Sequence, residues 1–117
     1  LRNCWGYPMT PVKFSPEARK DLQEIQSYIA NELCSQQAAD RTVSKILGRI
    51  RRLSSFPEIG TPLSAVLSFD TNYRYLVCGH YTAFYRVEQD AVYIVRILYG
   101  RRDFMRILFG EPPEENE

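Results

Sequence analysis

Arg101 and Arg102 stand directly after Gly100, near the C-terminal end of the chain. They follow an apolar stretch, 91–98, that has the composition of a buried strand. Two guanidinium groups at a glycine turn, at the end of a strand, form a planar pair of donors for an anion. The pair therefore suits phosphate or carboxylate recognition, with a merely solvated charged turn as the alternative.

Three further arginines lie inside predicted strands, one in each: Arg74, Arg86 and Arg96. Side chains alternate between the two faces of a strand, and one face of the sheet must cover the helices. An arginine in every strand therefore suggests that the other face is open and basic. Turn lengths set the register between strands, so a shared face for all three stays a hypothesis. In the alternative, one or two of them are exposed at an edge and inert.

Two amphipathic helices must support these strands. Ser15 is the predicted N-cap of the first helix and Pro16 its first residue, and the helix runs to about Leu33. The second helix is predicted from about residue 37 to residue 54. Their apolar stripes are Ala18, Leu22, Ile25, Ile29 and Leu33, then Ala39, Val43, Ile46, Leu47, Ile50 and Leu53. The two stripes predict a helix hairpin laid on a sheet.

The strands are predicted at 10–14, 73–78, 80–87 and 91–99, and the last three form an antiparallel meander because short turns join them. Residues 58–71 are expected to form a loop, and 103–109 a short helix. The predicted fold class is α+β. An N-terminal strand and an antiparallel helix hairpin pack on a small, mainly antiparallel sheet in the order β-α-α-β-β-β, and a short C-terminal helix follows.

Length and composition set limits on the organisation. The 117 residues suffice for a single domain, expected at 10–110. Residues 1–9 are expected to be disordered or an upstream extension, and 111–117 a disordered acidic tail. The net charge is +1, and the tail holds four glutamates, so residues 1–110 carry +5. This basic excess suggests an anionic partner, either nucleic acid or an acidic protein.

Several classes of protein are not expected. The chain has no run of about 20 apolar residues and no secretory signal, which favours the cytoplasm. Its three cysteines, Cys4, Cys34 and Cys78, fit neither a disulfide framework nor a zinc site. No motif for a metal, a nucleotide phosphate or a covalent nucleophile is present, so no cofactor is predicted.

The order and spacing of six segments resemble the RelE/ParE superfamily of bacterial toxins, the plasmid-stabilisation type of type II toxin–antitoxin system. The segments are 12–18, 21–29, 53–60, 73–77, 81–87 and 99–103. The likeness covers about residues 12 to 109. It implies a RelE-like fold and a growth-inhibitory, cytoplasmic addiction-module toxin. It also implies a cognate antitoxin that binds an exposed apolar patch and the basic surface of the second helix and the Arg101–Arg102 turn.

RelE-type members are ribosome-dependent endoribonucleases that need no metal and use arginine and lysine to stabilise phosphate charge. Arg74 matches a basic strand residue of that set, and Arg102, with Arg101 beside it, matches an arginine after the strand-ending glycine. Such cleavage also needs an acid and a base. His80 or Tyr81 is the candidate replacement for that pair.

Two positions depart from the ribonuclease pattern. Thr82 stands where those members usually have arginine, in an Arg-x-x-Tyr pattern that ends here at Tyr85. Leu108, or a neighbour, stands where some place a catalytic tyrosine. ParE-type members share the fold but poison DNA gyrase through protein contact, which requires no acid/base set.

The departures and the long paired helices favour a toxin that binds a cellular target such as DNA gyrase. The alternative is a ribosome-dependent mRNA endoribonuclease, and a third possibility is a relative that binds only its antitoxin. The candidate target-contact or phosphate-binding residues are Arg74, Arg101 and Arg102, with His80, Tyr81, Tyr85, Arg86 and Arg96 as accessory residues.

Overall fold

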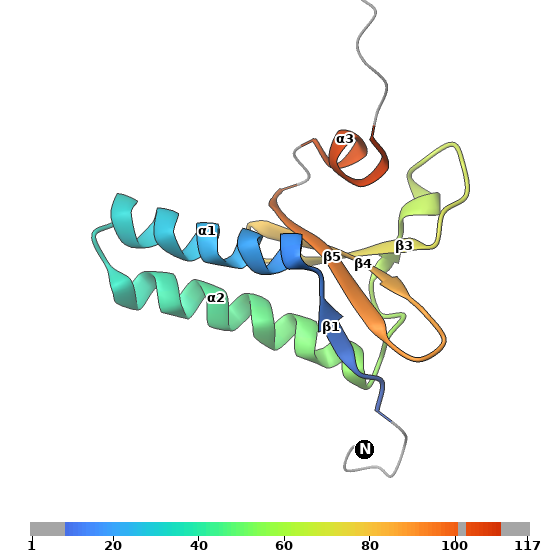
Figure 1. Ribbon diagram of the computed structural model, residues 1–117, viewed down its shortest axis with the longest axis horizontal. Coiled ribbons are helices and arrows are strands. Elements are labelled where there is room, and N and C mark those ends of the chain that lie inside the picture. The colour runs from blue at the N-terminus through green and yellow to red at the C-terminus, as the bar shows by residue number, and fades with distance from the viewer. Residues whose placement is uncertain (1–8, 101–102, 111–117) are drawn as a thin grey trace, which may run out of the picture.

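The computed structural model describes residues 9–100 and 103–110 (Figure 1). Its helices are α1 (Pro16–Glu32), α2 (Gln36–Arg51) and α3 (Phe104–Phe109), with single 3₁₀ turns η1 (Arg52–Ser54) and η2 (Leu63–Ala65). Its strands are β1 (Val12–Phe14), β2 (Thr61–Pro62), β3 (Tyr73–Cys78), β4 (Tyr81–Val87) and β5 (Val92–Tyr99). The predicted α+β class and element order are confirmed.

These strands form one sheet in the order β1-β5-β4-β3-β2. The predicted antiparallel meander of β3, β4 and β5 is present, while β1 pairs with β5 in parallel. Residues 58–71 were predicted to be a loop throughout, but this segment also contains β2 and η2. Leu63 anchors that segment and is fully buried.

Serine caps begin both long helices. Ser15 accepts a hydrogen bond from the Ala18 N–H at 2.9 Å and donates its hydroxyl to the Val95 carbonyl at 2.8 Å. It therefore fixes the start of α1 to β5 while satisfying a free N–H of the first turn. Ser35 caps α2 through the Ala38 N–H at 3.0 Å. Cys34, with φ of 49°, makes the tight turn between the two helices.

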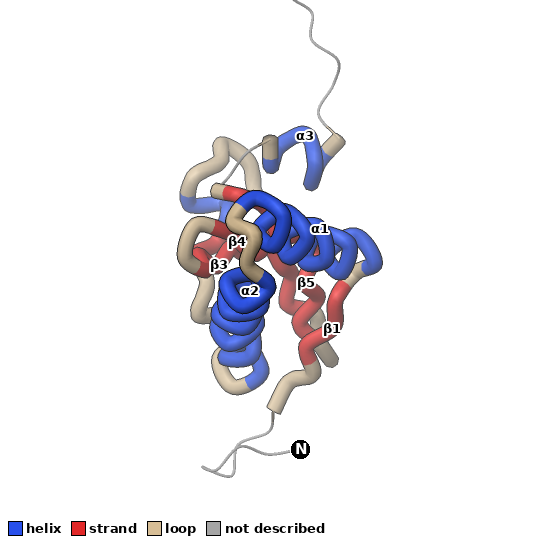
Figure 2. The backbone as a smooth tube through the Cα atoms, turned by 90° about the vertical axis from the view of Figure 1, so that its left-hand side faces the viewer, coloured by secondary structure: helices blue, strands red, loops and turns tan. Residues whose placement is uncertain are grey.

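The main core lies between the helix pair and one face of the sheet. Figure 2 shows α1 and α2 together on one side of the strands. Ile25, Ile46 and Ile50 of the predicted stripes are buried there. They share one cluster with sheet residues that include Leu76, Ala83, Tyr85, Val92 and Ile94. As expected for the outer face of an amphipathic helix, Lys45 and Arg49 are exposed.

A second apolar cluster covers much of the opposite sheet face. Phe84 and Leu98 are buried there with Leu63, and the apolar side of α3 packs onto them. The Phe104 ring stacks on Phe84 with centroids 5.5 Å apart and an interplanar angle of 8°. The idea of an open basic face was therefore wrong for the centre of the sheet. The apolar run that follows β5 buries itself on the nearest free sheet surface.

None of the helices in the described part of the chain combines the length and the apolarity needed to cross a bilayer.

Candidate functional site

Arg74 holds a loop in place. Its Nη1 donates to the carbonyl oxygens of Glu58 at 3.1 Å and Gly60 at 2.8 Å. Its strand position pairs with Tyr85, on the face that packs against the helices. Its guanidinium therefore binds the segment that leads into β2. From the sequence, the same guanidinium was predicted to contact a phosphate or the target.

Tyr85 helps to hold the same loop. It is fully buried, and its hydroxyl accepts a hydrogen bond from the Gly60 N–H at 2.9 Å. Burial is the main reason that the pKa of Tyr85 is raised above its usual value of 10.0. A Cβ at Gly60 would lie 2.5 Å from this hydroxyl and 2.6 Å from the Tyr75 carbonyl oxygen. Glycine is therefore required there, and the Tyr85 phenol already serves the fold.

Arg96 is bound to a residue that the sequence reasoning missed. Its Nε and Nη2 donate to the two carboxylate oxygens of Asp21, at 2.8 and 2.9 Å. The hydrogen bonds to Asp21 are the main cause of the raised pKa of Arg96. Asp21 follows Ala18 by three residues and precedes Ile25 by four, so the stripe itself placed an acid on the buried side of α1. That spacing was the available signal.

Arg86 lies on the other side of the sheet. Its guanidinium carbon is 5.9 Å from the Tyr73 ring centroid and 5.7 Å from that of Tyr93, and Nε donates to Glu88 at 3.0 Å. The hypothesis of one shared arginine face was therefore wrong. A register shift at Phe84/Tyr85 places an extra residue in β5, which breaks the simple alternation before Arg96.

His80 and Tyr81 meet the end of β5. The His80 ring lies 6.4 Å from that of Tyr99 in a stacked arrangement, and the Tyr81 ring lies 5.5 Å from Tyr99, edge to face. The Gly100 N–H donates to the His80 carbonyl at 2.8 Å. Arg101 and Arg102 lie outside the described residues, directly after this junction, so their predicted role stays a prediction.

The Tyr81 phenol is a weak acid in this setting. Burial, followed by the neighbouring Tyr99 and Tyr28 phenols, raises its pKa above 10.0. The hydroxyl therefore keeps its proton at neutral pH. It can donate a hydrogen bond, and acting as a base there would require a further group to lower that pKa.

A groove of about 790 Å³ runs between the helix pair and the β3–β4 turn. Its basic lining includes Lys45, Arg49 and Arg52, and its apolar lining includes Leu33 and Tyr99. These two side chains are 64% and 55% exposed. Exposed apolar side chains ringed by cations are typical of a protein-binding surface.

Among the described residues, no group of three or more histidine, cysteine, aspartate or glutamate side chains is placed to hold a metal ion.

Comparison with known proteins agrees with the fold. Residues 12–104 match the family described as the ParE toxin of the type II toxin–antitoxin system parDE. A curated relative, Toxin RelE3 of Caulobacter vibrioides, is 34% identical over 96 residues, which make up 79% of this chain and 96% of the relative.

Two solved structures share the architecture. The chromosomal ParDE system from P. aeruginosa contains a chain with a TM-score of 0.65 and 21% identity, covering 79% of this chain and 97% of that one. The RelBE2 toxin–antitoxin complex from Mycobacterium tuberculosis contains another, with a TM-score of 0.56, 20% identity and coverage of 79% and 92%. At these identities the two structures support the fold alone. With the family match over residues 12–104, this chain belongs to the ParE toxin family of type II toxin–antitoxin systems, within the RelE/ParE superfamily.

Proposed function

We propose that this chain is a growth-inhibitory toxin that acts in the cytoplasm by binding a protein target such as DNA gyrase, and that a cognate antitoxin neutralises it. The observation that carries this proposal is the environment of the two positions that depart from the ribonuclease pattern, one of which is buried and the other packed in an apolar cluster. Thr82 is 3% exposed. Leu108 packs in the second cluster, against the same sheet face.

A nucleolytic site needs an acid and a base within hydrogen-bonding reach of the scissile phosphate. Tyr85 is buried and bound to Gly60. Thr82 and Leu108 supply no group that titrates near neutral pH. A protein target requires only a complementary surface, which this chain offers without an acid/base pair.

One observation favours the ribonuclease alternative. His80 and Tyr81 lie against the end of β5, and Arg101 and Arg102 follow that strand in the sequence. A histidine, a phenol and two guanidinium groups are the group types that metal-free RNA cleavage uses. The alternative is therefore specific to this junction and is tested there.

The experiment compares two assays on the purified chain. We expect inhibition of DNA supercoiling by gyrase, and no new cuts in mRNA on translating ribosomes. The paired change His80→Ala and Tyr81→Phe should leave gyrase inhibition within about twofold, because a binding surface loses little from these truncations. Cleavage of mRNA that this double variant abolishes would replace the proposal with the alternative.

The antitoxin is proposed to occupy the groove between the helix pair and the β3–β4 turn. The apolar side chains there suit the apolar face of a partner helix or strand, and the cations suit acidic residues beside it. Lys45→Gln with Arg49→Gln should slow association with the antitoxin and weaken its dependence on salt. The matched pair Lys20→Gln and Arg41→Gln removes the same charge from exposed sites outside the groove lining. Equal rates at low and high salt for the unmodified chain would contradict this electrostatic role.

A further inference from the structure

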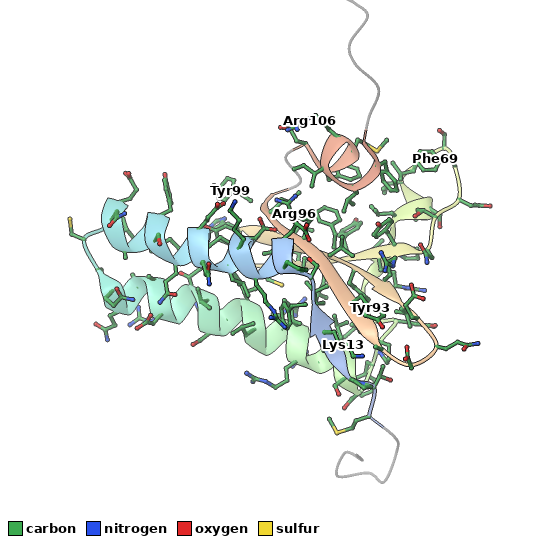
Figure 3. All side chains as sticks on the ribbon, in the orientation of Figure 1. Lys13, Phe69, Tyr93, Arg96, Tyr99 and Arg106 are labelled. Carbon is green, nitrogen blue, oxygen red and sulfur yellow. The ribbon has the colours of Figure 1, made fainter. Side chains whose placement is uncertain are left out.

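Four side chains form a row across the sheet, on the face opposite α1 and α2. Lys13 of β1 pairs with Tyr93 of β5, Tyr93 with Arg86 of β4, and Arg86 with Tyr73 of β3. We call these residues the cross-strand row. Figure 3 shows Lys13 and Tyr93 side by side beneath the end of the sheet that lies away from α3. Tyr73, at one end of the row, packs into the second apolar cluster, with its ring centroid 5.4 Å from that of Phe109. The other three residues, Lys13, Tyr93 and Arg86, are not members of that cluster.

Cations and rings alternate along the row at contact distance. The Lys13 Nζ lies 5.8 Å from the Tyr93 ring centroid, and the Arg86 guanidinium carbon lies 5.7 Å from the same centroid. Each ring holds its neighbouring cation by a cation–π interaction. The positions of the two charges are thereby fixed before any partner arrives, which lowers the entropy cost of binding.

A hollow of about 670 Å³ beside the row has a mixed lining, in which basic side chains outnumber acidic ones. Lys13, Arg19, Arg86 and Tyr93 line it, and Glu17 is the acidic residue among its lining groups. In the described part of the chain, neither Lys13 nor Arg19 forms an ion pair, whereas Arg86 pairs with Glu88. Two exposed cations without a carboxylate partner thus face the same space. Such a surplus of positive charge attracts an anion.

We propose that the cross-strand row and Arg19 bind the phosphate backbone of a nucleic acid, independently of its sequence. Lys13 and Arg86 stand two strands apart, about 10 Å, so they address different phosphates of one chain. A polymer with regularly spaced anions fits this geometry. The apolar side chains in the lining, Val12, Phe14, Ile94 and Val95, are buried or half-buried, and none of the large exposed apolar side chains lines the hollow. An acidic protein would therefore lack the protruding apolar anchors that protein interfaces use.

The tyrosines position the cations and do not stack on bases. The cations already lie beside the ring of Tyr93, so a base would have to displace them to reach it. The site therefore recognises charge and spacing, and its lining shares no residue with the antitoxin groove.

The test measures binding of the purified full chain to a fluorescein-labelled oligonucleotide by fluorescence anisotropy at several salt concentrations. The probe is DNA of mixed sequence about 20 nucleotides long, single-stranded or duplex. Lys13→Gln with Arg19→Gln should weaken binding about tenfold. It should also reduce the slope of log K against log salt by about 1.4 for the single strand and about 1.8 for the duplex. Both residues are exposed, so this variant should fold normally.

Lys20→Gln with Arg41→Gln is the matched control. It removes the same charge from exposed helix positions outside the hollow and should bind within about twofold of the unmodified chain. Tyr93→Leu should weaken binding severalfold with the salt slope unchanged, because it frees the cations without removing them.

Equal losses in the two charge variants would overturn the proposal. Competition by polyglutamate as strong as competition by unlabelled DNA would also overturn it, in favour of an acidic protein partner. Neither outcome depends on gyrase inhibition, which is measured separately. A chain that fails to inhibit gyrase can still bind DNA through this row, so the two proposals fail independently.

Discussion

Asp21 on α1 and Arg96 on β5 are 75 residues apart in the sequence and form a two-bond ion pair, at 2.8 and 2.9 Å. One oxygen of the same carboxylate also accepts the Ile97 backbone N–H at 2.9 Å. β1 covers β5 only as far as Ile94, so this N–H lies where the parallel partner has ended. The Asp21 carboxylate therefore takes the place of a strand carbonyl and satisfies a backbone N–H at the unpaired edge of β5.

Asp21→Asn should cost about 2–4 kcal/mol of unfolding free energy. The Asp21 carboxylate is largely buried, and removing its charge leaves the partly buried Arg96 without its partner. Chemical denaturation with urea measures the loss. Glu24→Gln is the control, because Glu24 is exposed on the same helix, and it should change stability by no more than about 0.5 kcal/mol. Equal stability of the two variants would show that the pair contributes nothing net.

The helices and strands were predictable because the spacing of their apolar residues indicates which side of each element is buried. Ile25, Ile46 and Ile50 recur at helical spacing and are buried against the sheet. The boundaries of β3 were predicted without error, and β4 and β5 each start one residue later than expected. Their aromatic and β-branched residues, joined by short turns, carry local information that is sufficient for a meander.

The site was harder to predict because it depends on contacts between distant segments. The extra residue in β5 places Arg96 opposite Phe84, so Arg96 no longer shares a face with Ile94, and nothing near Arg96 in the sequence indicates this shift. Arg74 binds carbonyl oxygens of a loop whose path the sequence left undefined. The burial of the second cluster depends on where α3 packs on the sheet, and that position is set by tertiary contacts and not by local sequence.

Arg74→Ala should destabilise the chain by about 1–2 kcal/mol, because two backbone carbonyl oxygens lose a charged donor at a partly exposed site. Arg74→Lys should recover part of that loss, since one ammonium group can still donate. Thermal unfolding of both variants provides the measurement, and Arg41→Ala is the control for a lost exposed charge. If Arg74→Ala unfolds like Arg41→Ala, then Arg74 is free for the contact role predicted from the sequence.

Tyr85→Phe should cost about 1–2 kcal/mol at neutral pH, because the buried Gly60 N–H loses its acceptor. Burial raises the pKa of Tyr85 above 10.0, so the folded chain holds this proton more tightly than the unfolded chain. The contribution is complete below about pH 10 and is lost as pH rises through the folded pKa. Stability curves from pH 7 to about 11 should therefore converge for Tyr85→Phe and the unmodified chain. A constant gap across this range would contradict the assignment.

Arg101→Ala and Arg102→Ala should abolish growth inhibition while leaving folding and antitoxin binding intact. The pair directly follows Gly100 in the sequence, and we expect its guanidinium groups to serve a contact and not the fold, so each substitution should change stability by no more than about 0.5 kcal/mol. Growth after induced expression measures toxicity, and co-purification with the antitoxin measures folding.

Arg102→Lys separates the two kinds of contact. A site that needs only positive charge tolerates lysine, whereas a planar two-bond contact with a phosphate or carboxylate does not. Full toxicity of both alanine variants would show that this turn is not the working surface.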